Sequence, residues 1–198
     1  MPSDHIVSSL AALESLYGAP SDFAVRKSID HLDSECQRFI TASPFMLLAT
    51  AGASGLDCSP RGDQPGFVEI TDAKTLTMPD RRGNNRIDSL RNILHDPRVG
   101  LLFLIPGVHH CLRVNGRAHI SIDPVLLQRF AIEGTAPKSV VVISVEQAFA
   151  QCARAVMRAK LWDADPSSPF SSDCGASTLP DLHRDGLEPS EFDAIQTR

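Results

Sequence analysis

The sequence predicts a mainly β fold, an antiparallel barrel or sandwich with helices around it. Seven short stretches rich in apolar residues follow one another, and turn-forming residues separate most of them. Most gaps are too short for the helical crossovers that a parallel sheet needs, which favours antiparallel neighbours. The predicted strands cover residues 45–50, 56–60, 66–71, 74–78, 98–105, 111–122 and 140–145.

Helices are predicted where apolar residues recur at helical spacing or where a start signal stands. Asp123 before Pro124 is a favoured pair at a helix start, and Asn85 with Asp88 matches a capping box. The predicted helices cover residues 4–17, 28–41, 86–95, 124–130 and the second half of 146–162. We therefore expect N-terminal helices in residues 1–42, a barrel in residues 43–162 and an irregular tail in residues 163–198.

The composition is that of an ordinary globular protein, with 198 residues, 42% hydrophobic residues and a net charge of −5. An acidic chain is not expected to bind nucleic acid or an anionic membrane surface. The longest apolar run, residues 99–106, is too short to span a bilayer. The five scattered cysteines form no CxxC pair and no signal peptide is visible, so we expect a cytoplasmic protein with reduced thiols and no metal site.

Residues 79–86 gather positive charge between a predicted strand and a predicted helix. A helix N-terminus presents unpaired N–H groups, and arginine adds a planar fork of donors that suits phosphate. Arg81, Arg82 and Arg86 supply these forks, while Gly83 lets the backbone approach a ligand closely. The same residues also fit a solvated loop whose arginines pair with neighbouring aspartates, so both interpretations stay open at this point.

Two further segments carry arginines. Arg61 stands between proline and glycine in residues 59–63, which fits a constrained ligand loop and a surface turn equally well. Strand alternation places Arg113, Asn115 and Arg117 on one face of the predicted strand 111–122. That face is either solvent-exposed or part of a binding surface.

Taken together, these segments resemble the FMN-binding split-barrel proteins related to pyridoxamine 5′-phosphate oxidase. The resemblance covers about residues 39–162 and rests on the order and spacing of several short motifs. The motifs are Ser43-Pro44-Phe45, Ser59-Pro60-Arg61-Gly62-Asp63, Pro65-Gly66-Phe67, Pro79-Asp80-Arg81, Gly83-Asn84-Asn85-Arg86, Asp88-Ser89-Leu90, Asp96-Pro97 and Leu112-Arg113-Val114-Asn115-Gly116. The likeness implies an antiparallel, Greek-key-like split β-barrel with flanking helices, and a homodimer whose interface holds FMN.

The resemblance also implies roles for individual residues. Arg61 and Arg86 match the positions that hold the FMN phosphate, and residues at the start of the following helix add neutral donors. Backbone groups of residues 78–80 would line the edge of the isoalloxazine ring. One strand would come from the partner subunit, and Trp162 would either cover the ring or pack the subunit interface. The implied cofactor-binding residues are Arg61, Met78, Pro79, Asp80, Arg81, Asn85, Arg86, Ser89, Cys111, Arg113 and Trp162.

Two departures argue against the oxidase itself. Ile87 stands where the oxidase has a lysine, and the oxidase's C-terminal Arg and His pattern has only a faint echo at His183-Arg184. We therefore expect an FMN-dependent oxidoreductase that acts on another small molecule, with the cofactor performing the hydride chemistry.

Three alternatives stay open. The first is a carrier or sensor that binds flavin, deazaflavin or haem without turnover. The second is a structural dimer in which the arginines form salt bridges. The third is a metal or haem site at His109 and His110, although adjacent histidines on a strand point to opposite faces.

Overall fold

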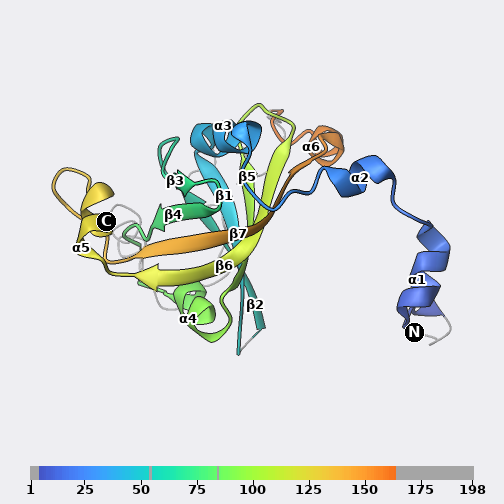
Figure 1. The fold of residues 1–198 in the computed structure, drawn as a ribbon, viewed down its shortest axis with the longest axis horizontal. Coiled ribbons are helices and arrows are strands. Elements are labelled where there is room, and N and C mark those ends of the chain that lie inside the picture. Colours follow the sequence, from blue (N-terminus) through green and yellow to red (C-terminus); the bar gives the residue numbers. More distant parts are fainter. Residues whose placement is uncertain (1–4, 54, 84, 164–198) are drawn as a thin grey trace, which may run out of the picture.

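A computed structural model describes residues 5–53, 55–83 and 85–163, and it contains one antiparallel sheet of seven strands in the order β2-β1-β5-β6-β7-β4-β3 (Figure 1). The strands are β1 (Phe45–Gly52), β2 (Gly55–Gly62), β3 (Glu69–Asp72), β4 (Thr75–Pro79), β5 (Arg98–Leu104), β6 (Cys111–Ser121) and β7 (Val140–Gln151). The edge strands β2 and β3 pair with one neighbour each, so the sheet curls without closing. The prediction of a mainly β, antiparallel fold with flanking helices is confirmed.

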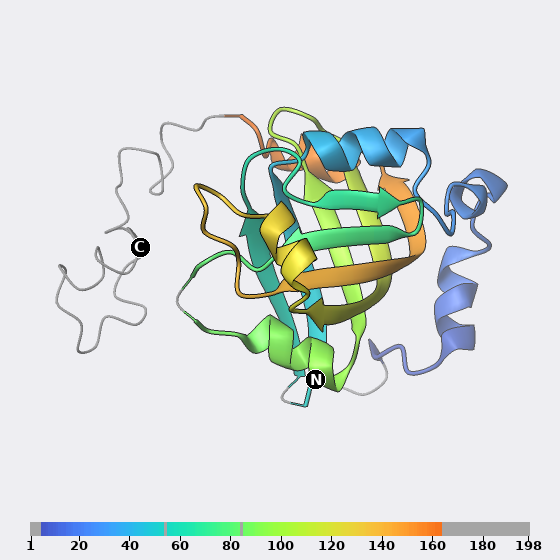
Figure 2. The same cartoon turned by 60° about the vertical axis from the view of Figure 1, so that its left-hand side comes forward.

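The helices lie around this sheet (Figure 2). They are α1 (Leu10–Tyr17), α2 (Asp22–Arg26), α3 (Ser34–Ala42), α4 (Asp88–His95), α5 (Pro124–Arg129) and α6 (Arg154–Ala159). α3 and α4 cover opposite ends of the curled sheet, and their buried faces join one continuous core with the strands. Asp123 caps α5 as predicted, since its Oδ1 accepts a hydrogen bond from the Val125 N–H at 2.8 Å.

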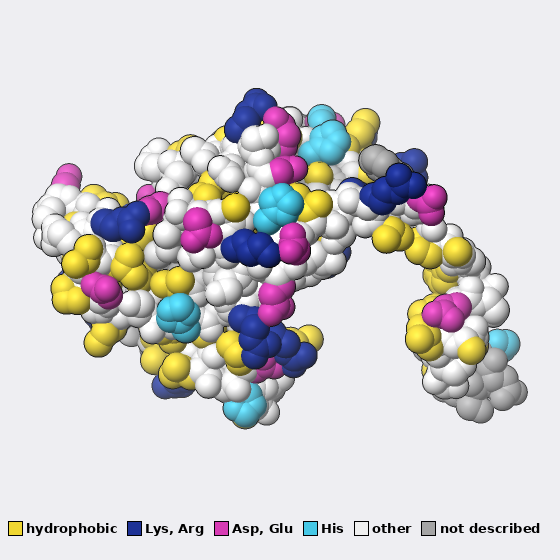
Figure 3. Space-filling view, in the orientation of Figure 1, with side chains coloured by type: hydrophobic (Ala, Val, Ile, Leu, Met, Phe, Trp, Pro, Cys, Tyr) yellow, Lys and Arg dark blue, Asp and Glu magenta, His cyan; other side chains and the backbone are white. Residues whose placement is uncertain are grey.

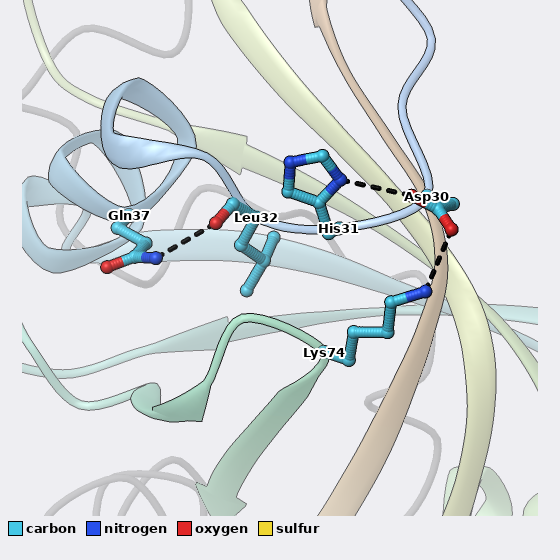
Figure 4. A network of polar contacts seen from close by, with 5 residues as sticks. All are labelled: Asp30, His31, Leu32, Gln37 and Lys74. Carbon is cyan, nitrogen blue, oxygen red and sulfur yellow. Dashed lines mark hydrogen bonds and ion pairs between the residues drawn. The ribbon is translucent and has the colours of Figure 1, made fainter.

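The helix predicted over residues 28–41 is shorter than expected and begins at Ser34, after the N-cap Asp33. The preceding residues are extended, because Ile29 exchanges backbone hydrogen bonds of 3.0 and 2.7 Å with Ala148 of β7. Figure 4 shows how this segment is fastened to the β3–β4 hairpin: Lys74 donates to Asp30 at 2.8 Å, and Asp30 also contacts the His31 ring. A tertiary contact thus overrides the helical pattern.

The helix predicted in the second half of residues 146–162 is present as α6, and β7 continues past the predicted strand end at residue 145 to Gln151. A β-bulge interrupts the pairing of β6 with β7. Asn115 faces Gln147 and Gly116 faces Val145, which leaves Glu146 unpaired. The inward positions therefore change from odd to even numbers along β7.

α4 sits where the sequence predicts a helix but begins at Asp88, and Ile87 is its N-cap. Asn85 does not cap it, since its backbone is left-handed with φ of 57°. Asn92 anchors the helix on β1: its amide donates to the Thr50 hydroxyl at 3.0 Å in the buried interior. Gly52 packs so closely that an added Cβ would lie 1.9 Å from the Asn92 oxygen.

α1 and α2 form an arm that stands away from the sheet (Figure 1). No residue of α1 is buried, and hydrophobic side chains lie along the arm in Figure 3. Of the predicted tail, residues 163–198, only residue 163 is among the described residues. Among the described helices, none is both long and apolar enough to cross a membrane.

Candidate functional site

A cationic cleft of about 620 Å³ lies where β2 and β4 end, beside the loops that lead into α4 and β7. Its volume is within the range of small-molecule sites. The basic side chains that line it are Arg61, Arg81, Arg82, Arg86 and Lys138. Asp80 and Ser59 are among its polar neighbours. The two arginine loops that the sequence singles out are therefore brought together at one place.

Arg61, near the end of β2, is the best-enclosed cation of the cleft, with 23% of its side chain exposed. Its Nη1 donates to Asp80 Oδ1 at 3.2 Å. Its Nε is buried, and within the described part of the chain this N–H has no hydrogen-bond partner. An unpaired buried donor is destabilising by about 1–3 kcal/mol. The Nε atom itself is closed off from the cleft, so a ligand there meets the exposed part of the Arg61 side chain.

Arg81 is a structural neighbour of Arg61. Its Nε donates to Asp63 Oδ2 at 2.7 Å, and its Nη1 donates to the Phe130 carbonyl at 2.6 Å. The pairs Arg61–Asp80 and Arg81–Asp63 thus cross between the ends of β2 and β4, and Arg81 also holds the end of α5. These contacts fix residues 59–63 and residues 79–86 to one another, which are two of the three arginine-bearing segments of the sequence analysis.

Arg86 lies at the mouth of the cleft, before α4. Its side chain is 79% exposed, and its Nε donates to Asp88 Oδ2 at 2.5 Å. The hydrogen bond to Asp88 raises the pKa of the Arg86 guanidinium above its ordinary value, so the group stays charged. Asn85 beside it also lines the cleft, and Arg82 is exposed at the rim.

A smaller hollow of about 250 Å³ adjoins the cleft. Ser59, Arg61 and Arg86 line both spaces and mark the boundary between them. Ser89 lines only the smaller hollow; it is buried, and its hydroxyl donates to Asp57 Oδ2 at 2.9 Å. The predicted neutral donor is therefore close to the arginines but already has an acceptor.

The strand segment predicted to line the flavin edge lies beside the cleft. Met78 and Pro79 are buried in β4, where they pair with β7. The Asp80 N–H donates to the Ser139 carbonyl at 2.9 Å. Of these three residues, Asp80 alone lines the cleft, through its place beside Arg61.

The remaining predicted residues lie elsewhere. Cys111 faces Gln151, whereas the cleft end of β7 is at Val140, so Cys111 and Arg113 are at the opposite end of β6. The Arg113 guanidinium is 4.8 Å from the centre of the Phe149 ring. Trp162 donates from Nε1 to the Val108 carbonyl at 2.9 Å, at that same far end. Within one chain the structure does not bring these three residues to the cleft.

Lys138 is a cleft residue that the sequence reasoning missed. Its Nζ donates to Asn85 Oδ1 at 3.0 Å. The available signal was a lysine two residues before the last strand. Its role depends on β7 lying beside β4, and no local sequence pattern shows which strands are neighbours.

The third alternative, a metal or haem site at His109 and His110, finds no matching cluster in the described residues. His109 and His110 are exposed. Over the described ranges, no group of three or more His, Cys, Asp or Glu side chains is placed to hold a metal ion. His183-Arg184 lies outside the described residues.

Comparison with known proteins gives a family match. The family model described as pyridoxamine 5′-phosphate oxidase matches residues 32–152. No curated protein matches the sequence.

Solved structures give likenesses in fold alone. A single-substitution variant of HupZ from Group A Streptococcus is 20% identical with a TM-score of 0.51, over 61% of this chain and 99% of that chain. A second HupZ structure is 20% identical with a TM-score of 0.50, over 60% and 92% of the two chains. A FAD-binding protein from Mesorhizobium loti is 20% identical with a TM-score of 0.41, over 63% and 99%.

Proposed function

Because the chain belongs to the pyridoxamine 5′-phosphate oxidase family, we propose that it is an FMN-dependent oxidoreductase for a small molecule, and that the cleft at Arg61 holds the FMN phosphate. The observation that carries this proposal is the convergence of Arg61, Arg86 and three further basic side chains on one cleft. Phosphate oxygens accept hydrogen bonds from guanidinium N–H groups, and the planar guanidinium suits phosphate geometry.

The residues present fit a phosphate. Among the described residues, five basic side chains and one carboxylate, that of Asp80, line the cleft. Asp80 holds Arg61 by a single nitrogen, Nη1. Because a guanidinium has five N–H donors, one such contact leaves others for a ligand. Arg61 would therefore bind the phosphate from the enclosed side of the cleft, and Arg86 would bind it from the mouth.

FMN bound in this place supplies two-electron hydride chemistry, and the protein orients it. The roles of this chain's own residues are to bind and to position. Arg61 and Arg86 neutralise the phosphate, and Asp80 keeps the Arg61 side chain against the cleft wall through their 3.2 Å contact. Ser59 lies between the two hollows as a neutral hydroxyl beside the phosphate.

A homodimer follows from the same proposal. β6 has eleven residues, which corresponds to a length of about 35 Å at the usual rise of an extended strand. Cys111, Arg113 and Trp162 at its far end are too distant to act in the cleft of their own chain. If they contact the cofactor, they do so from a second copy.

FMN titration of the purified protein, followed by flavin fluorescence, tests the proposal. We expect binding at micromolar FMN, and a loss of about 10- to 100-fold in affinity for Arg61→Met, as for a lost charged hydrogen bond. Arg38→Met is the matched control, since Arg38 is an ion-paired arginine on α3 remote from the cleft. Failure of the unaltered protein to bind micromolar FMN would sink the proposal.

Turnover is tested separately. The FMN-loaded protein is mixed anaerobically with NADH, NADPH or another hydride donor, and bleaching of the flavin absorbance is followed. Reduction supports an oxidoreductase. FMN that binds yet is reduced by none of these donors indicates a carrier or sensor.

A further inference from the structure

We propose that Lys138 is a ligand of the same phosphate, so that the loop between α5 and β7 forms a third wall of the phosphate site and selects a phosphate monoester. This inference rests on the proposed function, and it adds a residue and an element that the family likeness does not supply. Lys138 is exposed, lines the cleft and lies on a loop remote in sequence from both arginine loops.

The pairing of β4 with β7 fixes where Lys138 lies. Pro79 faces Val140 at the end of the two strands. The pairing continues one step further, since the Asp80 N–H donates to the Ser139 carbonyl at 2.9 Å. The next residue on one side is Arg81 and on the other Lys138, and both line the cleft. The pairing of β4 with β7 therefore places Lys138 at the cleft.

The loop that carries Lys138 is held at its other end as well. Arg81 Nη1 donates to the Phe130 carbonyl at 2.6 Å, at the C-terminal end of α5. Ile132 and Thr135 exchange backbone hydrogen bonds of 3.0 and 2.8 Å, which closes the turn between them. Contacts at both ends reduce the conformational freedom that Lys138 would lose on binding a ligand.

The charge of Lys138 is compensated differently from that of three of the four arginines in the cleft. Arg61, Arg81 and Arg86 each pair with an aspartate. In the part of the chain that the structure describes, Lys138 has no carboxylate partner, and its ammonium donates to the neutral Asn85 amide. An uncompensated cation beside three guanidiniums is repelled by them, and an anion in the cleft removes that repulsion.

The experiment compares FMN with riboflavin, which has the same ring system without the phosphate. Affinities are measured at about pH 8, where a phosphate monoester carries close to two negative charges. The variants are Lys138→Met, Lys138→Arg and the matched control Lys160→Met, an exposed lysine after α6. Lys138 is exposed, so its substitution leaves the fold intact.

We expect Lys138→Met to weaken FMN binding about 10- to 100-fold with riboflavin affinity unchanged. Lys138→Arg keeps most of the preference for FMN, and Lys160→Met matches the unaltered protein. FMN binding that Lys138→Met leaves unchanged overturns this inference while the proposed function stands. An equal loss for FMN and riboflavin overturns it too, and absence of FMN binding by the unaltered protein removes both.

Discussion

Arg81 donates a hydrogen bond from its Nε to Oδ2 of Asp63 over 2.7 Å, and this ion pair fastens the end of β4 to the segment that follows β2. The same side chain reaches the Phe130 carbonyl. Arg81 thus joins the end of β4 to the segment after β2 and to the end of α5, and its main role is to hold them together. This distinguishes it from Arg61, whose hydrogen bond to Asp80 uses Nη1 alone.

Arg81→Met is therefore expected to lower the free energy of unfolding by about 1–3 kcal/mol, because Asp63 and the Phe130 carbonyl lose their donor. Urea denaturation followed by circular dichroism measures the change. Arg82→Met is the matched control one residue further on: Arg82 is exposed, and the expected change is within about 0.5 kcal/mol. Equal stability of the two variants would contradict the structural role of Arg81.

Gly52→Ala is expected to destabilise the protein by about 1–3 kcal/mol through overpacking against α4. The new Cβ would lie 1.9 Å from the Asn92 side-chain oxygen, and Asn92 is held by its hydrogen bond to Thr50. Gly83→Ala is the control, since a Cβ there meets nothing within 4 Å. If thermal unfolding shows the same midpoint for both variants, the packing of α4 on β1 is not as described.

The lowered pKa of Asp30 predicts that the stability of the protein depends on pH in the acid range. Hydrogen bonds from Lys74 and then from His31 lower the pKa of Asp30 from 3.8 to about 2. A lowered folded-state pKa stabilises the protein above the unfolded value, and this contribution is lost as pH falls from about 4 to about 2. Asp30→Asn should flatten that part of the stability profile, and Lys74→Met should do the same. Profiles that stay parallel to the unaltered protein's would refute the link.

The thiols are expected to react in an order set by burial. Burial raises the pKa of the Cys36 thiol to about 11 and raises that of Cys111, which suppresses their reactive thiolates. Cys58 and Cys152 are exposed. Iodoacetamide labelling of the folded protein, read by mass spectrometry, should modify Cys58 and Cys152 well before Cys36 and Cys111. Early labelling of Cys36 would mean that α3 opens readily.

Because Cys58 lines the smaller hollow, bound FMN should slow its labelling.

Local patterns were sufficient to predict most of the fold. Alternation and turn residues place all seven strands, and Asp123 with Pro124 marks the start of α5. The helix predicted over residues 28–41 begins only at Ser34, because Ile29 pairs with Ala148, a residue far along the chain. A short window of sequence contains only local neighbours. The apolar spacing therefore predicted a helix over residues that pair with a distant strand instead.

The sequence singles out Arg61 and the loop 79–86, because arginines beside glycine or proline and a helix start carry a local signal. The structure brings these two segments to one cleft, and their binding of FMN stays a prediction. Their reciprocal pairing with Asp80 and Asp63 was not foreseen, nor was Lys138. Both depend on which strands are neighbours in the sheet.

The bulge opposite Gly116 has a consequence for how this chain tolerates change in length. Glu146 is the one extra residue there, and it sets the direction of every side chain after it, including Phe149 beneath Arg113. Gly116 admits the bulge, since a Cβ would lie 2.2 Å from the Ser144 carbonyl oxygen. Deleting Glu146 would reverse which side chains point inward and which point outward in the part of β7 that follows it. The end of β7 beside the cleft would keep its arrangement. In lineages that share this sheet, β7 should therefore vary in composition far more readily than in length.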